Sequence, residues 1–172
     1  MGNFVLPPNI LRLLEMLCSI VAFSLIFGWK SEGVTYRQLD HSEYDVINNI
    51  DFFLGMSVLT LLIVSILCFV ILIKPVYLSP CLDLVINALL GGFLLIAAIV
   101  MCSSLTQLGN SITVKEAGLT FSSMEGAIAF GFICSLSLAG NSWFAYQAHR
   151  QRSDIPLNQS HAHASLPVDI PT

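Results

Sequence analysis

The sequence predicts an all-α membrane protein: a transmembrane four-helix bundle of M-shaped topology, with both termini on the same side of the membrane. Three segments of spanning length carry no Asp, Glu, Lys or Arg: Phe52–Ile73, Leu84–Leu105 and Gly126–Ala145. A helix needs about 20 apolar residues to cross the hydrocarbon core, and it satisfies its backbone polar groups internally. The composition agrees, because 55% of the 172 residues are hydrophobic and only 10% are charged. Soluble domains carry about 25% charged residues.

The first predicted span, residues 10–29, is less apolar than the others because it contains Arg12 and Glu15. A secretory signal peptide is the alternative, but it would begin with a basic region and end in a small-residue cleavage site. The opening MGNFVLPPNI has no Lys or Arg, and no Ala-x-Ala site follows it. We therefore interpret this segment as a membrane span, in which the long Arg12 side chain reaches back to the lipid headgroups.

The predicted spans are residues 10–29, 52–73, 84–105 and 124–147, within a membrane domain of residues 10–148. Residues 1–9 form a short segment before this domain. Residues 149–172 are polar and rich in proline, and we expect them to be a disordered tail because they bury too little apolar surface to fold.

The distribution of basic residues favours cytosolic termini, because Lys and Arg concentrate on the cytosolic side of membrane proteins. Four of the seven share the side of the termini: Arg12, Lys74, Arg150 and Arg152. The other three are Lys30, Arg37 and Lys115. A glycan on the sequon Asn158-Gln159-Ser160 would reverse this orientation.

Five polar residues lie within the spans or at their edges: Arg12, Glu15, Asp83, Asn87 and Asn141. Arg12 and Glu15 are three residues apart and can meet on one helix face, so we expect an interfacial ion pair. Asn87 and Asn141 are expected to hydrogen-bond to neighbouring helices, each contributing about 0.6 kcal/mol. An ion or proton pathway is the alternative, but it would need charge near the bilayer centre, where the sequence has none.

Small residues recur at four-residue spacing in the last two spans: Ala88 and Gly92, then Ala127, Gly131, Ser135 and Ala139. Such stripes let helix backbones approach closely in membranes. We interpret them as packing positions within the bundle, and self-association between protomers is the alternative.

The cysteines and aromatic residues give further predictions. Neither predicted outer loop contains a cysteine, so we expect no disulfide there. Cys81 lies at the cytosolic mouth of the third span and is a candidate for palmitoylation; a small buried hydrophobe is the alternative. Trp29, Trp143 and Tyr146 fall near the predicted interfaces, where aromatic residues anchor helices.

No motif for catalysis is present in the sequence. It lacks the zinc-protease, nucleophile-elbow, phosphate-loop and dinucleotide patterns, and nothing resembles a pore-lining ring or a broken transporter helix. The net charge of −4 does not suit nucleic acid, which attracts basic surfaces. We therefore expect no enzyme activity, no cofactor, no metal and no nucleic-acid partner.

Two segments resemble a known family. ILRLLEMLCSIVAFSLIFG, with Arg12 three residues before Glu15, resembles the opening of MARVEL-domain proteins, and Asp83 heading the third span is also similar. GAIAFGFICSLSLAGNSWFAYQAHR looks like the last span of the synaptogyrin and synaptophysin branch. The likeness runs from about Pro8 to Arg152. The outer loops lack the cysteines of synaptophysins, and the tail lacks their Tyr-rich repeats.

This resemblance implies a four-span protein with cytosolic termini that acts in vesicle trafficking, membrane apposition, cell junctions or cell fusion. We expect a non-enzymatic integral membrane scaffold of the plasma membrane or of vesicles. Its expected partners are membrane lipids, other membrane proteins or further copies of itself. The alternatives are an accessory subunit of a membrane complex and a small channel or transporter subunit.

Overall fold

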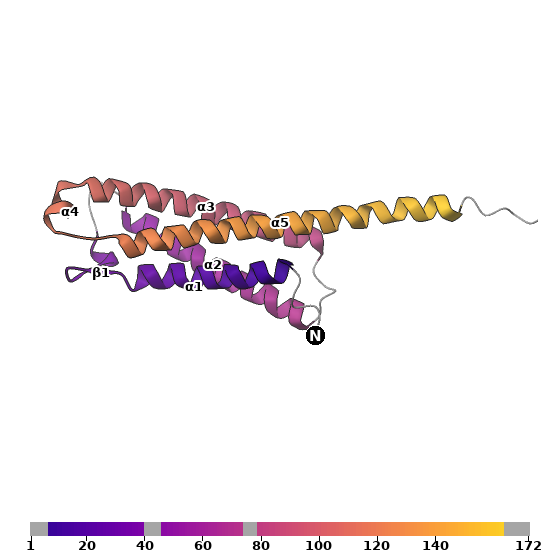
Figure 1. Cartoon of the computed structure of the whole chain (residues 1–172), viewed down its shortest axis with the longest axis horizontal. Helices are drawn as coiled ribbons and strands as arrows, with labels where there is room; N and C mark the ends of the chain where they lie inside the picture. Colours follow the sequence, from indigo (N-terminus) through magenta and orange to yellow (C-terminus); the bar gives the residue numbers. More distant parts are fainter. Residues whose placement is uncertain (1–6, 40–45, 74–78, 164–172) are drawn as a thin grey trace, which may run out of the picture.

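Four long helices dominate the computed structural model, which describes residues 7–39, 46–73 and 79–163 (Figure 1). They are α1 (Pro7–Phe27), α2 (Val46–Ile73), α3 (Pro80–Asn110) and α5 (Ser122–His163). Each contains an apolar stretch long enough to cross a membrane, as the sequence predicts. The all-α, four-helix fold class is therefore confirmed.

The helices form a ring in which each packs against two neighbours. The main contacts join α1 to α2, α2 to α3, α3 to α5 and α5 back to α1. Helix α1 begins, and α5 leaves the bundle, at the same end of the molecule (Figure 1). We call this the terminal end, and the opposite end, which carries the short elements β1 and α4, the hairpin end.

The helices extend beyond the apolar runs because capping residues set their ends. Helix α1 begins at Pro7, since a proline in the first turn has no amide hydrogen to leave unpaired. Helix α3 begins at Pro80, and the Ser79 hydroxyl accepts a hydrogen bond of 3.2 Å from the Leu82 amide. Such caps satisfy amides that the helix itself cannot pair.

Helix α5 continues to His163 and projects beyond the other helices (Figure 1). This differs from the prediction of a disordered tail from residue 149 onward. A helix that is already formed extends at the cost of one residue per hydrogen bond, whereas a new one must first be nucleated. The remaining part of the predicted tail, residues 164–172, lies outside the described residues.

A two-stranded hairpin closes the hairpin end. Strand β1 (Lys30–Ser31) pairs antiparallel with β2 (Val34–Thr35). The two turn residues, Glu32 and Gly33, both have positive φ, 48° and 82°, as a type I′ hairpin turn requires. A short 3-10 helix, η2 (Tyr36–Gln38), follows this hairpin, and α4 (Ile112–Glu116) lies between α3 and α5.

Trp29 fixes the hairpin to the start of α5. Its ring stacks on Phe121 at 5.5 Å between centroids, and its indole N–H donates to the Thr120 carbonyl at 2.9 Å. Trp29 is only 4% exposed, so the prediction that it anchors in the lipid interface is wrong. Trp143 and Tyr146 are exposed, and their role as interface anchors stays a prediction.

Large apolar side chains fill the middle of the bundle. Phe53 of α2 and Leu94 and Met101 of α3 are almost completely buried. The Phe53 ring lies against Gly131 of α5, which has room for it because glycine carries no side chain.

Candidate functional site: a buried polar cluster at the terminal end

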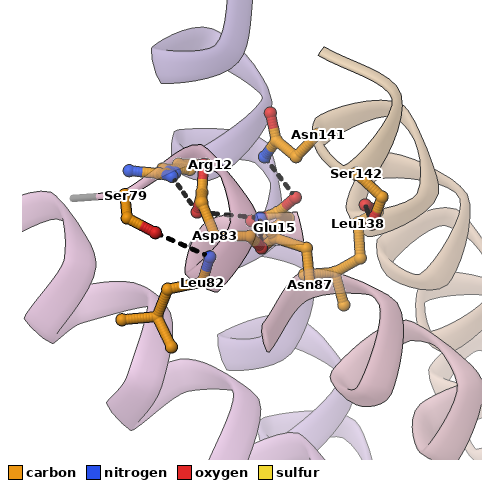
Figure 2. A network of polar contacts seen from close by, with 9 residues as sticks. All are labelled: Arg12, Glu15, Ser79, Leu82, Asp83, Asn87, Leu138, Asn141 and Ser142. Carbon is orange, nitrogen blue, oxygen red and sulfur yellow. Dashed lines mark hydrogen bonds and ion pairs between the residues drawn. The ribbon is translucent and has the colours of Figure 1, made fainter. Parts of the chain in front are cut away.

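Five polar side chains from three helices gather near the terminal end of the bundle (Figure 2). We call them the polar cluster: Arg12 and Glu15 of α1, Asp83 and Asn87 of α3, and Asn141 of α5. Four of the five are at most 2% exposed, and the Asp83 side chain is 19% exposed. All five were predicted from the sequence because they are polar residues within or beside apolar spans, and the structure brings them together.

Asp83 occupies the centre of the first half of the cluster. Its Oδ1 atom accepts a bond of 2.6 Å from Arg12 Nη2 and one of 3.0 Å from Asn87 Nδ2. Asp83 lies in the first turn of α3, where the partial positive charge of the helix N-terminus also favours a carboxylate. This contact joins α1 to α3 across the ring.

Glu15 and Asn141 form the second half, which joins α1 to α5. The Asn141 side-chain amide donates to Glu15 Oε1 at 2.7 Å, and Glu15 is 0% exposed. The structure thus corrects the predicted Arg12–Glu15 ion pair, because each of these residues bonds to a different helix. It also corrects the prediction that Arg12 reaches the headgroups, since Asp83 holds it inside the bundle.

Asn87 differs from the prediction as well. Its amide donates to the backbone carbonyl of Asp83 at 2.8 Å and to the Asp83 carboxylate at 3.0 Å. Both partners lie on its own helix, one turn earlier, so Asn87 orients Asp83 instead of joining two helices. Asn141 does reach a neighbouring helix.

The polar cluster also contains most of the unpaired polar atoms of the protein interior. Within the described residues, six buried side-chain atoms have no hydrogen-bond partner, and five belong to the cluster: Arg12 Nε, Arg12 Nη1, Glu15 Oε2, Asn87 Oδ1 and Asn141 Oδ1. Buried polar atoms in folded proteins are nearly always paired. Their concentration at one place marks the cluster as a candidate site.

The small residues of α5 lie on two different surfaces. Ala127, Gly131 and Ser135 are buried, whereas Ala139 is exposed. A side chain at Gly131 would come within 2.7 Å of the Phe53 ring. The first three therefore face the bundle, and Ala139 does not.

The packing positions predicted for α3 are wrong, because the glycine that contacts α5 lies one residue before the predicted one. Ala88 and Gly92 are exposed, and a Cβ at position 92 would have no neighbour within 4 Å. The close approach occurs at Gly91, where a Cβ would lie 3.2 Å from Leu138 Cβ. The Ser135 hydroxyl also donates to the Gly91 carbonyl at 2.9 Å. The sequence pattern pointed to the neighbouring glycine because α3 is apolar around its whole circumference.

The exposed small residues Ala88, Gly92 and Ala139 line an open groove of about 270 Å³ between α3 and α5, on the outside of the bundle. Its lining residues are Asn87, Ala88, Gly91, Gly92, Leu95, Ser135, Ala139 and Ser142. Small side chains on a lipid-facing surface permit close contact with another membrane helix.

The five cysteines are all unpaired. Cys81 is exposed in the first turn of α3, so it is accessible for the predicted palmitoylation, which stays a prediction. Cys134 is buried, and its thiol contacts the Ser19 hydroxyl at 3.5 Å and the Glu15 carbonyl at 3.6 Å. Sequence reasoning missed these α1–α5 contacts, because neither the serine nor the cysteine carries a local signal for a partner more than 100 residues away.

The fold and the cluster together define a class: an integral multi-pass membrane protein whose four helices enclose their polar side chains. A comparison with protein-family models gives the family. The model of the MARVEL membrane-associating domain matches residues 4–144, and the chain belongs to the MARVEL family. This domain occurs in vesicle-trafficking and junction proteins and is generally non-enzymatic.

Searches of curated proteins and of solved structures find no match. The family model covers all of α1, α2, α3 and α4 and the part of α5 up to Phe144. It therefore includes all five residues of the polar cluster.

Proposed function

We propose that this protein is a non-enzymatic scaffold that organises membrane at vesicles or at cell contacts, with both termini in the cytosol. The family supports a membrane role shared by trafficking and junction proteins. Such a scaffold acts through contacts with lipids and membrane proteins, and it resides in the plasma membrane or in vesicle membranes.

The observation that carries this proposal is the apolar layer across the middle of the bundle. A channel or carrier needs polar groups along the whole path across the bilayer. Here the polar cluster occupies one end, and beyond it the described interior contains no buried charged side chain. Phe53, Leu94 and Met101 fill most of that space, and the buried polar groups among them are single hydroxyls such as those of Ser57 and Thr60. This arrangement favours a packed scaffold over a conducting subunit.

The proposal is tested by removing the protein from cells that express it and measuring membranes by electron tomography. We expect a changed number or size of small vesicles, or a shorter length of closely apposed membrane, with recovery on re-expression. Unchanged vesicles and contacts, together with ion flux through proteoliposomes of the purified protein, would instead support the channel subunit.

The exposed small residues Ala88, Gly92 and Ala139 support a second candidate, an accessory subunit of a membrane complex. A helix of another membrane protein, or of a second copy, could approach closely at these positions. Co-purification of one partner at fixed stoichiometry in mild detergent would favour the accessory subunit. Purification of this protein without a partner, as a monomer or a dimer, would favour the scaffold.

A further inference from the structure

The polar cluster contains one more negative than positive charge. Arg12 contributes one cation, and Glu15 and Asp83 contribute two carboxylates. Arg12 bonds directly to Asp83 at 2.6 Å and compensates that carboxylate. The charge of Glu15 is therefore left without a direct ionic partner.

Glu15 is also poorly supplied with hydrogen-bond donors. Oε1 accepts one bond from the neutral Asn141 amide, and Oε2 has no partner. The residue lies about 12 Å along α1 from Pro7, at 1.5 Å per residue, and is 0% exposed. An ionised carboxylate that is buried in this way is strongly disfavoured unless a cation accompanies it.

Within the described residues, the groups around Glu15 offer oxygen ligands but no cation besides Arg12, whose Nε and Nη1 atoms are buried and unpaired in the same cluster. The Asn87 and Asn141 side-chain oxygens are also buried and unpaired. The other groups that interact electrostatically with Glu15 are Arg12, Asp83 and three thiols: Cys18 of α1, Cys68 of α2 and Cys134 of α5. Neutral thiols cannot balance its charge.

We propose that the polar cluster is a cation site centred on Glu15, which binds one positive charge in the folded protein. The charge is a proton on the Glu15 carboxyl group or a monovalent metal ion such as Na⁺ held by carboxylate and amide oxygens. Oxygen ligands suit hard cations of this kind. The inference does not depend on the scaffold function, because it concerns only the charge balance inside the bundle.

The experiment measures unfolding of the full-length protein in detergent micelles, followed by the fluorescence of Trp29 and Trp143. One series varies pH between about 5 and 8. A second varies Na⁺ over about two decades, with an organic cation holding ionic strength constant. Because only the folded state holds the cation, lower pH or higher Na⁺ is expected to stabilise it. The unfolding equilibrium constant changes by up to tenfold per pH unit or per tenfold change in Na⁺ concentration.

Glu15→Gln is expected to abolish the dependence, because the variant has no charge to balance. The matched control is Glu125→Gln, an exposed carboxylate at the other end of α5, which should keep the wild-type behaviour. A response to pH alone identifies the bound charge as a proton, and a response to Na⁺ identifies a metal ion. The proposal is overturned if Glu15→Gln shows the same dependence on both as the wild type.

A second variant tests the site if Glu15→Gln does not fold. Asn141→Ala removes the hydrogen-bond donor that contacts the Glu15 carboxylate. It is expected to shift the midpoint of the pH or Na⁺ dependence, whereas an unchanged midpoint would place the linked charge elsewhere and overturn the proposal. Infrared difference spectra between the two pH limits give an independent reading, because a protonated carboxyl has its own carbonyl band.

Discussion

Gly131→Ala is the substitution whose effect the structure defines most closely. A Cβ at this position would lie 2.7 Å from Phe53 Cε2 and 2.8 Å from Cζ, and 3.6 Å from the Ala98 methyl group. Carbon atoms pack at about 3.5–4.0 Å, so the ring has to move. Phe53 is 0% exposed, and its neighbours leave it little room to do so.

Two opposing terms set the size of the effect. Inserting a methyl group into a packed core costs about 1–3 kcal/mol. Replacing glycine by alanine inside a helix stabilises the folded state by up to about 1 kcal/mol. We expect a net loss of about 1–2 kcal/mol, which raises the unfolded fraction roughly five- to thirtyfold.

The assay is reversible unfolding in mixed micelles of a mild detergent and dodecyl sulfate, followed by tryptophan fluorescence. Gly92→Ala is the matched control, because a Cβ there meets nothing within 4 Å. It has the same helix-propensity gain without the steric cost, so it should be neutral or more stable by up to about 1 kcal/mol.

A double variant separates the steric contact from other causes. Phe53→Leu shortens the side chain that meets position 131, so Gly131→Ala should cost less in that background. Contacting residues of this kind typically show coupling of about 0.5–3 kcal/mol. Equal stability of Gly131→Ala and Gly92→Ala, or no coupling to position 53, would refute the packing described for this layer.

Three further predictions concern the cluster and the two ends of the bundle. Arg12→Gln leaves Asp83 without its cation and should destabilise the protein by roughly 3 kcal/mol, and adding Asp83→Asn should restore part of the loss; unfolding in mixed micelles checks both. Trp29→Phe keeps an aromatic ring but loses the hydrogen bond to Thr120, so it should cost about 1 kcal/mol. This variant is measured by circular dichroism in the same micelles, because it lacks the buried tryptophan that reports unfolding. Cys81→Ser should abolish labelling by a palmitate analogue, and labelling that persists unchanged in this variant would show that another residue is the modified one.

The number and type of the helices could be predicted because lipid leaves few choices. A charge-free run of spanning length has to be helical to pair its backbone. The same apolar composition does not indicate which face of each helix packs against its neighbours. Helix α3 is apolar on every side, so the sequence gives no face to choose, and the prediction selected Gly92 where Gly91 meets α5.

The members of the polar cluster could be predicted, but their pairing could not. Each is conspicuous as a polar residue in an apolar segment. Their partners lie on other helices, with Asp83 71 residues from Arg12 and Asn141 126 residues from Glu15. Local spacing favoured Arg12 with Glu15, because it contains no information about which helices become neighbours.

The central claim, a membrane scaffold with cytosolic termini, is tested most directly by immunogold electron microscopy of the native protein. The antibody is raised against residues 154–172 and is applied to opened and to intact membranes. The account predicts gold on the cytosolic face of small vesicles, or on the cytosolic face where two cells meet. Gold on the outer or lumenal face would contradict the orientation, and label spread evenly over all membranes would contradict the scaffold role.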